Sequence, residues 1–136
     1  MAKSPSKVII DTNLWISFLI KKDLRNLDTK IKNGSVKVLF SLELIEEFLS
    51  VADRPKFKKY FDKNDIEDLV DLFDVYGEII DVRSNVELCE DPKDNFLLSL
   101  AKDSKANYLI TGDKELLSLK TVFKTKIITM SDYLKE

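Results

Sequence analysis

The chain contains no histidine and only one cysteine, Cys89. The absence of histidine excludes Ser-His-Asp triads, histidine general bases and ordinary histidine-ligated zinc sites. A lone cysteine cannot form an internal disulfide, which suits a reducing compartment. The chemistry left to this chain is that of carboxylates, hydroxyls, amines and bound metal ions.

Glycine and proline are also scarce, with 3 of each among 136 residues, which leaves little room for a long flexible linker. No long apolar run is present either, because Asp11 and Asn13 interrupt the short apolar stretch near the N-terminus. We therefore expect one domain over residues 7–136 behind a flexible tail of residues 1–6. The same absences predict a cytoplasmic protein that does not enter membranes.

Neither sign of charge dominates, since 22 basic residues are balanced by 24 acidic ones and the formal net charge is −2. A chain with this balance has no global basic field of the kind that attracts nucleic acids. Any nucleic-acid site must therefore depend on local basic patches, or on metal ions that reverse the local charge.

Short apolar runs alternate along the chain with longer runs of helical periodicity. The strand-like runs are residues 7–10, 36–40, 79–82, 108–111 and 126–129. The helical runs are residues 14–20, 42–52, 66–73, 92–104 and 114–119. This alternation predicts an α/β domain, a three-layer Rossmann-like fold with a central parallel sheet flanked by helices. Ligands of such folds bind beyond the carboxyl ends of the strands, so the residues after each strand are the first candidates for chemistry.

Two aspartates follow predicted strands. Asp11 comes directly after the first strand, with Asn13 close by, and Asp113 comes after the strand at 108–111 and the turn at Gly112. Each aspartate taken alone is better explained as the N-cap of the next helix. Together they bring two carboxylates to one edge of the sheet.

Two further acids lie in predicted helices. Asp91 precedes Pro92, so it is a natural N-cap, whereas Asp94 falls in the first turn, where a side chain pointing back to the sheet edge can reach a metal. An acid in the first turn also suits the helix dipole, which is the structural explanation for Asp94. Glu47 flanks the apolar face formed by Leu44, Ile45, Phe48, Leu49 and Ala52. It either overhangs a cleft or is a solvated side chain beside the core.

Four segments resemble the PIN domain family in order and spacing: residues 8–13, 44–57, 91–95 and 108–117. The run Thr111-Gly112-Asp113-Lys114-Glu115-Leu116-Leu117 after a strand is particularly characteristic. The resemblance implies a PIN-like nuclease in which Asp11, Glu47, Asp94 and Asp113 bind Mg²⁺ or Mn²⁺ and cleave RNA. It also implies a supporting polar residue at Thr111, while Asn13, from its place beside Asp11, offers another oxygen ligand or hydrogen-bond donor.

The resemblance is nearest to the toxin components of bacterial and archaeal toxin–antitoxin pairs. It therefore implies an antitoxin protein as partner, and a homodimer is the expected assembly. The sequence Met130-Ser131-Asp132 departs from the family, which usually has a proline-containing turn after the last strand.

An RNA substrate that approaches an acidic site needs flanking cations. The basic residues at 54–59 are interleaved with aromatic side chains, as in surfaces that bind single strands; they are Arg54, Lys56, Lys58 and Lys59. The competing interpretation is a solvated basic helix whose Phe57 and Phe61 pack into the core.

Other enzyme classes fit less well. A haloacid-dehalogenase-type phosphatase needs a second Asp two residues after the first, and that position is Asn13. A receiver domain needs paired acids before the first strand, and no Gly-x-Gly-x-x-Gly occurs for a dinucleotide. A PIN-like module that binds RNA or protein without cutting remains the alternative to a Mg²⁺- or Mn²⁺-dependent ribonuclease. The complete set of four acids argues against it.

Overall fold

The computed structural model describes residues 5–21 and 27–135 of the chain. The elements, in chain order, are β1 (Ser6–Ile10), α1 (Thr12–Lys21), α2 (Leu27–Lys32), β2 (Val36–Phe40), α3 (Leu42–Ala52), the 3₁₀ turn η1 (Pro55–Phe57), α4 (Lys63–Tyr76), β3 (Glu78–Ile79), α5 (Pro92–Ser104), β4 (Tyr108–Ile110), α6 (Lys114–Leu119), β5 (Thr121–Val122), β6 (Thr125–Ile128) and α7 (Met130–Leu134).

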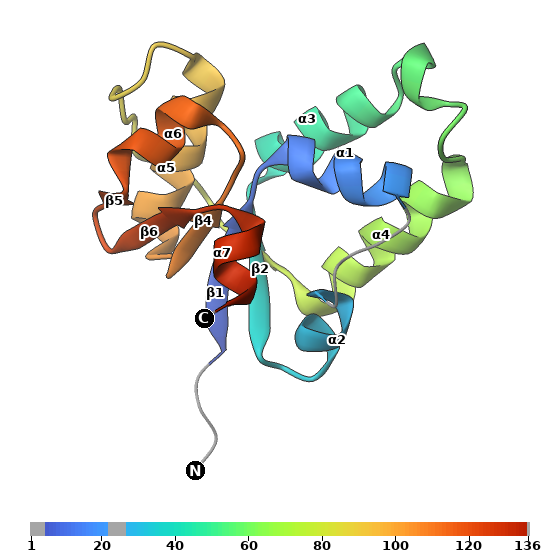
Figure 1. Ribbon diagram of the computed structural model, residues 1–136, viewed down its shortest axis with the longest axis horizontal. Helices are drawn as coiled ribbons and strands as arrows, with labels where there is room; N and C mark the ends of the chain where they lie inside the picture. The colour runs from blue at the N-terminus through green and yellow to red at the C-terminus, as the bar shows by residue number, and fades with distance from the viewer. Residues whose placement is uncertain (1–4, 22–26, 136) are drawn as a thin grey trace.

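The strands form one sheet in the order β3-β2-β1-β4-β6-β5. All neighbours are parallel except β5 and β6, which form an antiparallel pair at one edge. In Figure 1, α1, α3 and α4 lie on one side of β1 and β2, and α5 and α6 lie on the other. This arrangement confirms the predicted α/β fold with a mostly parallel central sheet flanked by helices.

The strand order reverses next to β1. From β1 the chain builds outward through β2 and β3, then returns to place β4 on the other side of β1. Such a reversal leaves a crevice beyond the carboxyl ends of the two central strands, which is the usual ligand site of open α/β sheets. The residues that follow β1 and β4 therefore share one edge, and the Asp11 N–H donates to the Ile110 carbonyl at 3.0 Å.

An aromatic cluster packs the helices on one side against the sheet. Phe73 of α4 lies with its ring centroid 4.7 Å from that of Trp15 in α1 and 4.3 Å from that of Phe40 in β2. Phe48 of α3 contacts the same ring at 6.3 Å. Gly77, just after α4, sits against this cluster, because a Cβ there would lie 2.6 Å from the Phe73 carbonyl oxygen. The cluster thus positions α3, which carries one of the predicted site residues.

Helix caps explain where several helices begin. The Ser41 hydroxyl accepts a hydrogen bond from the Leu44 N–H at the start of α3. Asp62 and Asp65 form a reciprocal capping box at the start of α4. Thr129 accepts from Asp132 N–H and begins α7, a helix absent from the predicted elements. The departure from the family at Met130 thus produces a capped helix.

The described structure corrects four other predictions. The third strand is Glu78–Ile79 rather than 79–82, because the Arg83 and Ser84 N–H groups donate to the carboxylate of Asp103 on α5 and hold the following loop there. Leu49 is 40% exposed rather than on the buried face of α3. The elements α2, η1 and β5 were not predicted. The first strand begins at Ser6, inside the predicted tail, whose residues 1–4 lie outside the described part.

No helix in the described part of the chain is both long and apolar enough to cross a membrane.

Candidate functional site

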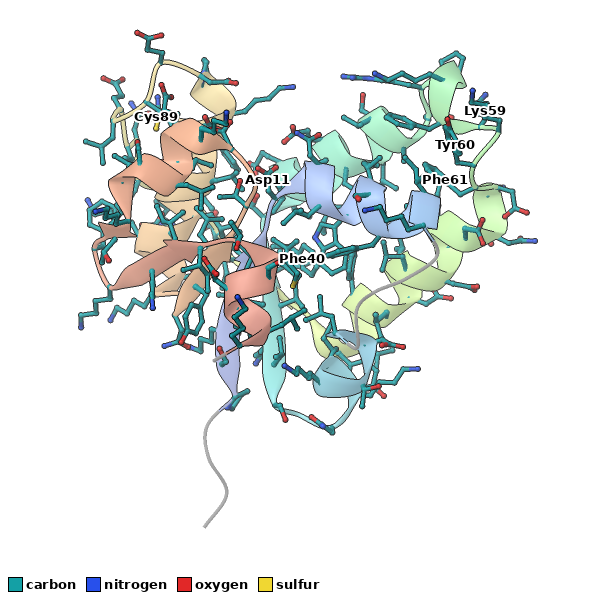
Figure 2. The ribbon with its side chains drawn as sticks, in the orientation of Figure 1. Asp11, Phe40, Lys59, Tyr60, Phe61 and Cys89 are labelled. Atoms are coloured by element: carbon teal, nitrogen blue, oxygen red, sulfur yellow. The ribbon has the colours of Figure 1, made fainter. Side chains whose placement is uncertain are left out.

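Asp11 and Asp113 are linked through Thr111 at the carboxyl edge of the sheet. The Thr111 hydroxyl donates to Asp11 Oδ2 at 2.8 Å and accepts from the Asp113 N–H at 3.0 Å. Burial raises the pKa of Asp11, the Thr111 hydrogen bond opposes that rise, and the nearby Asp113 carboxylate adds to it. Figure 2 shows Asp11 at the centre of the molecule, between its two groups of helices. Two aspartates far apart in sequence are therefore within electrostatic reach of one another.

Both aspartates also cap helices. Asp113 Oδ1 accepts from the N–H groups of Glu115 and Leu116 at 2.8 and 3.2 Å, at the start of α6. Asp11 Oδ1 accepts a longer bond from the Asn13 N–H at 3.4 Å. The capping and the site interpretations are therefore compatible, because one carboxylate has two oxygens and each oxygen has two lone pairs.

Asp94 differs from its neighbour Asp91 as predicted from the helix start. The Asp91 side chain is exposed and accepts from the Lys93 N–H at 2.9 Å, as an N-cap does. Asp94 is only 6% exposed, and its side chain accepts no hydrogen bond from the described residues. Burial is the largest cause that raises its pKa from 3.8 to about 6, and the carboxylates of Asp113, Asp91, Asp11 and Glu115 supply the rest of that rise. A buried acid without a hydrogen-bond partner is costly, so this group is suited to receive a cation.

Glu47 joins the group from α3. Burial raises its pKa, the Lys93 ammonium opposes that rise, and the Asp11 carboxylate adds to it. The Lys93 Nζ lies 3.7 Å from Glu47 Oε1, so an ion pair spans from α5 to α3. Glu46, the alternative acid, is exposed. Glu47 thus lies close enough to Asp11 to sense its charge, while being partly neutralised by Lys93.

The four predicted acids are coupled but not tightly packed. Among the described residues, no three of them have ligand atoms within 4.8 Å of one another. Like charges repel, so four carboxylates without a counter-ion are expected to stand apart. The side chain of Asn13 is exposed, and only its backbone N–H contacts Asp11, at the long distance given above.

Two residues that were not predicted lie beside Asp94. Ligand atoms of Cys89, Asp94 and Glu115 all lie within 4.8 Å of one another, the one such group in the part of the chain that is described. Burial, followed by the hydrogen bond and charge of the adjacent Glu115 carboxylate, raises the pKa of the Cys89 thiol to about 11. Glu115 lies two residues after Asp113, a spacing that could have marked it. Nothing in the sequence indicated the position of Cys89.

The predicted RNA-binding residues lie beyond the far end of α3. All four are exposed: Arg54 is the N-cap of η1, Lys56 lies on it, and Lys58 and Lys59 follow it. Figure 2 shows Lys59 and Tyr60 at the edge of the molecule, well apart from Asp11.

The aromatic side chains of this segment divide between surface and core. Phe61 is buried and Phe57 partly buried with stacked rings, whereas Tyr60 is 43% exposed with the Lys59 ammonium 5.0 Å from its ring centroid. The segment is therefore anchored to the core by Phe57 and Phe61, while its cations and Tyr60 face solvent.

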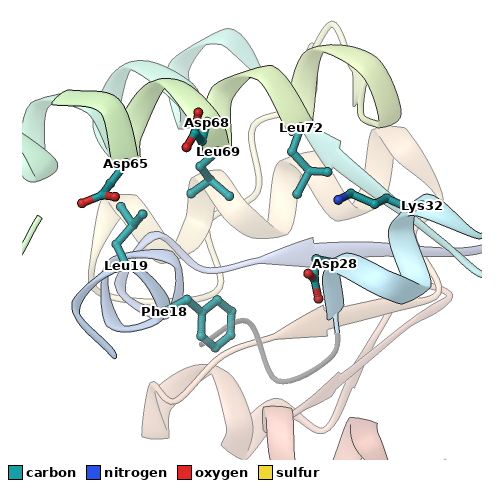
Figure 3. A pocket seen from close by; sticks show the side chains of 8 residues that line it. All are labelled: Phe18, Leu19, Asp28, Lys32, Asp65, Asp68, Leu69 and Leu72. Atoms are coloured by element: carbon teal, nitrogen blue, oxygen red, sulfur yellow. The ribbon is translucent and has the colours of Figure 1, made fainter. Parts of the chain in front are cut away.

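A pocket of 360 Å³ lies elsewhere, between α1, α2 and α4. Its apolar walls are Phe18, Leu19, Leu69 and Leu72, as Figure 3 shows. None of the four predicted acids lines it, so this pocket is separate from the carboxylate group.

Comparison with known proteins identifies the family of the chain. The family model of the PIN domain matches residues 7–115 of the chain. An uncharacterized protein of Methanocaldococcus jannaschii is 35% identical over 124 residues, which cover 88% of this chain and 79% of that protein. PIN domains are generally metal-dependent nucleases that act on RNA. The match over most of its length shows that this chain belongs to the PIN domain family.

Proposed function

We propose that this PIN domain is a ribonuclease that depends on Mg²⁺ or Mn²⁺ and uses Asp11, Glu47, Asp94 and Asp113 as its catalytic acids. The observation that carries the proposal is the electrostatic coupling of these acids at the end of β1 and β4. Asp11, Glu47 and Asp94 have raised pKa values, and in each case the charge of another member of the set contributes to the rise. Such mutual destabilisation of like charges is relieved by a divalent cation.

The donor atoms fit a hard cation. All four side chains supply carboxylate oxygens, the ligands that Mg²⁺ and Mn²⁺ prefer. Asp94 and Asp113 would hold such an ion with Asp11, and Glu47 would complete the set from α3. A bound dication supplies Lewis-acid chemistry: it activates water and offsets charge on the phosphate. The Thr111 hydroxyl orients the Asp11 carboxylate through its 2.8 Å hydrogen bond.

The exposed cations of residues 54–59 support RNA as the substrate. The helix α3 has 11 residues, so its two ends are separated by roughly 16 Å. A single strand lying along α3 would reach from the carboxylates to Lys58, Lys59 and Tyr60. Backbone contacts of this kind give affinity that falls as salt rises. We therefore expect Lys58→Gln with Lys59→Gln to raise KM several-fold with little change in kcat, and this difference to shrink at high salt.

The test is cleavage of labelled RNA in Mn²⁺ or in EDTA. We expect the wild type to cut only with Mn²⁺, and Asp11→Asn to lose on the order of 10²-fold or more in rate, as when one preorganised charge-stabilising group is removed. Matched controls are available in the chain. Asp91→Asn and Glu46→Gln remove exposed acids close to the site and should leave the rate unchanged, unlike Asp94→Asn and Glu47→Gln. Equal cleavage by wild type and Asp11→Asn in EDTA would reject the mechanism.

The role of toxin in a toxin–antitoxin pair is part of the proposal. It is supported by the sequence resemblance described above, which also implies an antitoxin partner and a homodimer. Growth arrest on expression of the wild type, absent with Asp11→Asn and relieved by the protein encoded next to it, is the expected outcome. Normal growth with a cleavage-active protein would separate the nuclease from the toxin role.

A further inference from the structure

Cys89 lies beside the acidic group on the side of Asp11 opposite to Lys59, as Figure 2 shows. It comes from the loop before α5, while Asp94 and Glu115 come from the first turns of α5 and α6. A thiol and two carboxylates from three segments thus have ligand atoms within 4.8 Å of one another. No role in the proposed nuclease mechanism uses Cys89 or Glu115.

The loop that carries the thiol is held in place by polar contacts. The Cys89 N–H donates to Asn95 Oδ1 at 2.7 Å, and Asn95 Nδ2 donates back to the Cys89 carbonyl at 2.7 Å. The next residue, Glu90, donates its N–H to Glu115 Oε1 at 3.2 Å. These bonds tie the loop to both α5 and α6, so the position of the thiol is fixed by the fold.

Asp94 provides an independent indication of a ligand. The residue is 6% exposed, and its side chain accepts no hydrogen bond from the described residues and has an oxygen within 4.8 Å of both other groups. A buried carboxylate normally has a donor or a cation as partner. Cys89 and Glu115 remain accessible from solvent, so an ion can reach this position.

The ligand set selects the class of ion. Mg²⁺ disfavours sulfur, whereas a borderline-soft ion such as Zn²⁺ binds thiolate and carboxylate together. In a tetrahedral ion with bonds of roughly 2.0–2.3 Å, two ligand atoms lie about 3.3–3.8 Å apart. Ligand atoms within 4.8 Å of one another therefore reach such an ion by side-chain movements on the order of 1 Å. Three protein ligands leave the fourth position of a tetrahedral ion to water.

We propose that Cys89, Asp94 and Glu115 form a second cation site that takes Zn²⁺ or a similar thiophilic divalent ion. On binding, the Sγ–metal bond forms and the thiol proton is released to solvent, with no change of oxidation state. Because Asp94 belongs to both sites, an ion bound here removes a ligand from the nuclease centre and inhibits cleavage. This second consequence rests on the proposed ribonuclease function, whereas the binding itself does not.

Co²⁺ is the probe, because it replaces Zn²⁺ and its bond to a thiolate gives a charge-transfer band in the near ultraviolet. Cys89 is the only cysteine and the chain has no histidine, so the band reports this one side chain. We expect the wild type to develop the band at one Co²⁺ per chain, and Zn²⁺ to abolish it, since Zn²⁺ binds more tightly than Co²⁺. No band, or saturation at one ion per two chains, would overturn the proposal.

Variants test the composition of the site. Cys89→Ser should lack the band, and Glu115→Gln should weaken Co²⁺ binding by at least the roughly 10–100-fold that loss of an outer-shell partner costs a metal site. Glu87→Gln is the control, because it removes an exposed glutamate from the same loop. Unchanged affinity in Glu115→Gln, with the melting temperature of the wild type, would overturn the assignment of Glu115.

The two proposals fail in different ways. If the protein shows the band but cuts no RNA, the cation-site proposal stands and the ribonuclease proposal is rejected. If the protein cuts RNA but shows no band, only the cation-site proposal is rejected. If both hold, Zn²⁺ should inhibit the wild type in the presence of excess Mn²⁺, and Cys89→Ser should be several-fold less sensitive.

Discussion

Replacing Asp94 by asparagine should stabilise the protein when no metal is bound. The pKa of Asp94 is about 6 in the folded state against 3.8 ordinarily, and one pKa unit corresponds to about 1.4 kcal/mol. The ionised side chain therefore costs the fold about 3 kcal/mol at neutral pH. Asparagine has nearly the same shape without the charge, so Asp94→Asn should recover most of this free energy of unfolding.

The pH dependence of this gain in stability shows whether the charge of Asp94 is its cause. A carboxyl group whose folded pKa is raised binds more protons in the folded state than in the unfolded state between pH 3.8 and about 6. The stability of the wild type should fall as pH rises through this window and level off above it. The difference between Asp94→Asn and wild type should be near zero at pH 4 and reach its full value by pH 7.5. Below the window both side chains are neutral.

The measurement is thermal or urea unfolding in EDTA at a series of pH values. For a domain of this size, 3 kcal/mol corresponds to a rise in melting temperature on the order of 10 °C. Asp71→Asn is the control, because it removes an exposed acid from α4 and should change stability little. Adding Mn²⁺ should make the wild type more stable than Asp94→Asn, because the ion binds the folded wild type more tightly than the folded variant.

Two outcomes would refute the reasoning. If Asp94→Asn were less stable than wild type at pH 7.5 in EDTA, the carboxylate would have a partner that the structure does not show. If the gain were the same at pH 4 and pH 7.5, it would arise from packing rather than from charge.

Two other substitutions test the surroundings of the site and the core. Thr111→Val removes the hydrogen bond that lowers the pKa of Asp11. The acid limb of the pH–rate profile should therefore move to higher pH, and activity should fall more at pH 6 than at pH 8. Thr111→Ser should restore the profile, and an unmoved limb in Thr111→Val would contradict the role of the hydroxyl. Gly77→Ala would place a Cβ 2.6 Å from the Phe73 carbonyl oxygen, so chemical denaturation should show a loss of about 1–3 kcal/mol from overpacking. Gly112→Ala is its control, since a Cβ there meets no atom within 4 Å, and equal stability of the two variants would contradict the packing argument.

Most of the fold and part of the site could be read from local patterns. The strands at β1, β2 and β4 are continuous apolar runs, and α3, α5 and α6 have clear caps, so these elements were predicted to within one or two residues. The position of a residue directly after a parallel strand fixes which edge it occupies, whatever the rest of the chain does. Asp11 and Asp113 were therefore predictable as neighbours before any contact was known.

The remainder depends on contacts between distant segments. The loop of residues 80–91 has no periodic pattern, and its path is set by bonds to α5, such as those from Arg83 N–H to Asp103 and from Cys89 N–H to Asn95. A thiol held in this way has no local signature. The two-residue strand β3 was predicted too long for the same reason, because the chain leaves the sheet where those bonds begin. Short elements gain their stability from tertiary contacts rather than from their own sequence.

The two roles of Asp11 and Asp113 determine which substitutions can test the chemistry. Asp113 caps α6 through one oxygen, and asparagine caps a helix about as well as aspartate. Alanine would remove both the cap and the charge, so a loss of activity in Asp113→Ala could reflect a loosened α6 rather than a missing ligand. Asparagine keeps the cap and removes the charge alone. A loss of activity in Asp113→Asn while α6 stays folded therefore indicates that Asp113 binds the cation. Activity that is kept in Asp113→Asn but lost in Asp113→Ala indicates that Asp113 acts only as the cap of α6.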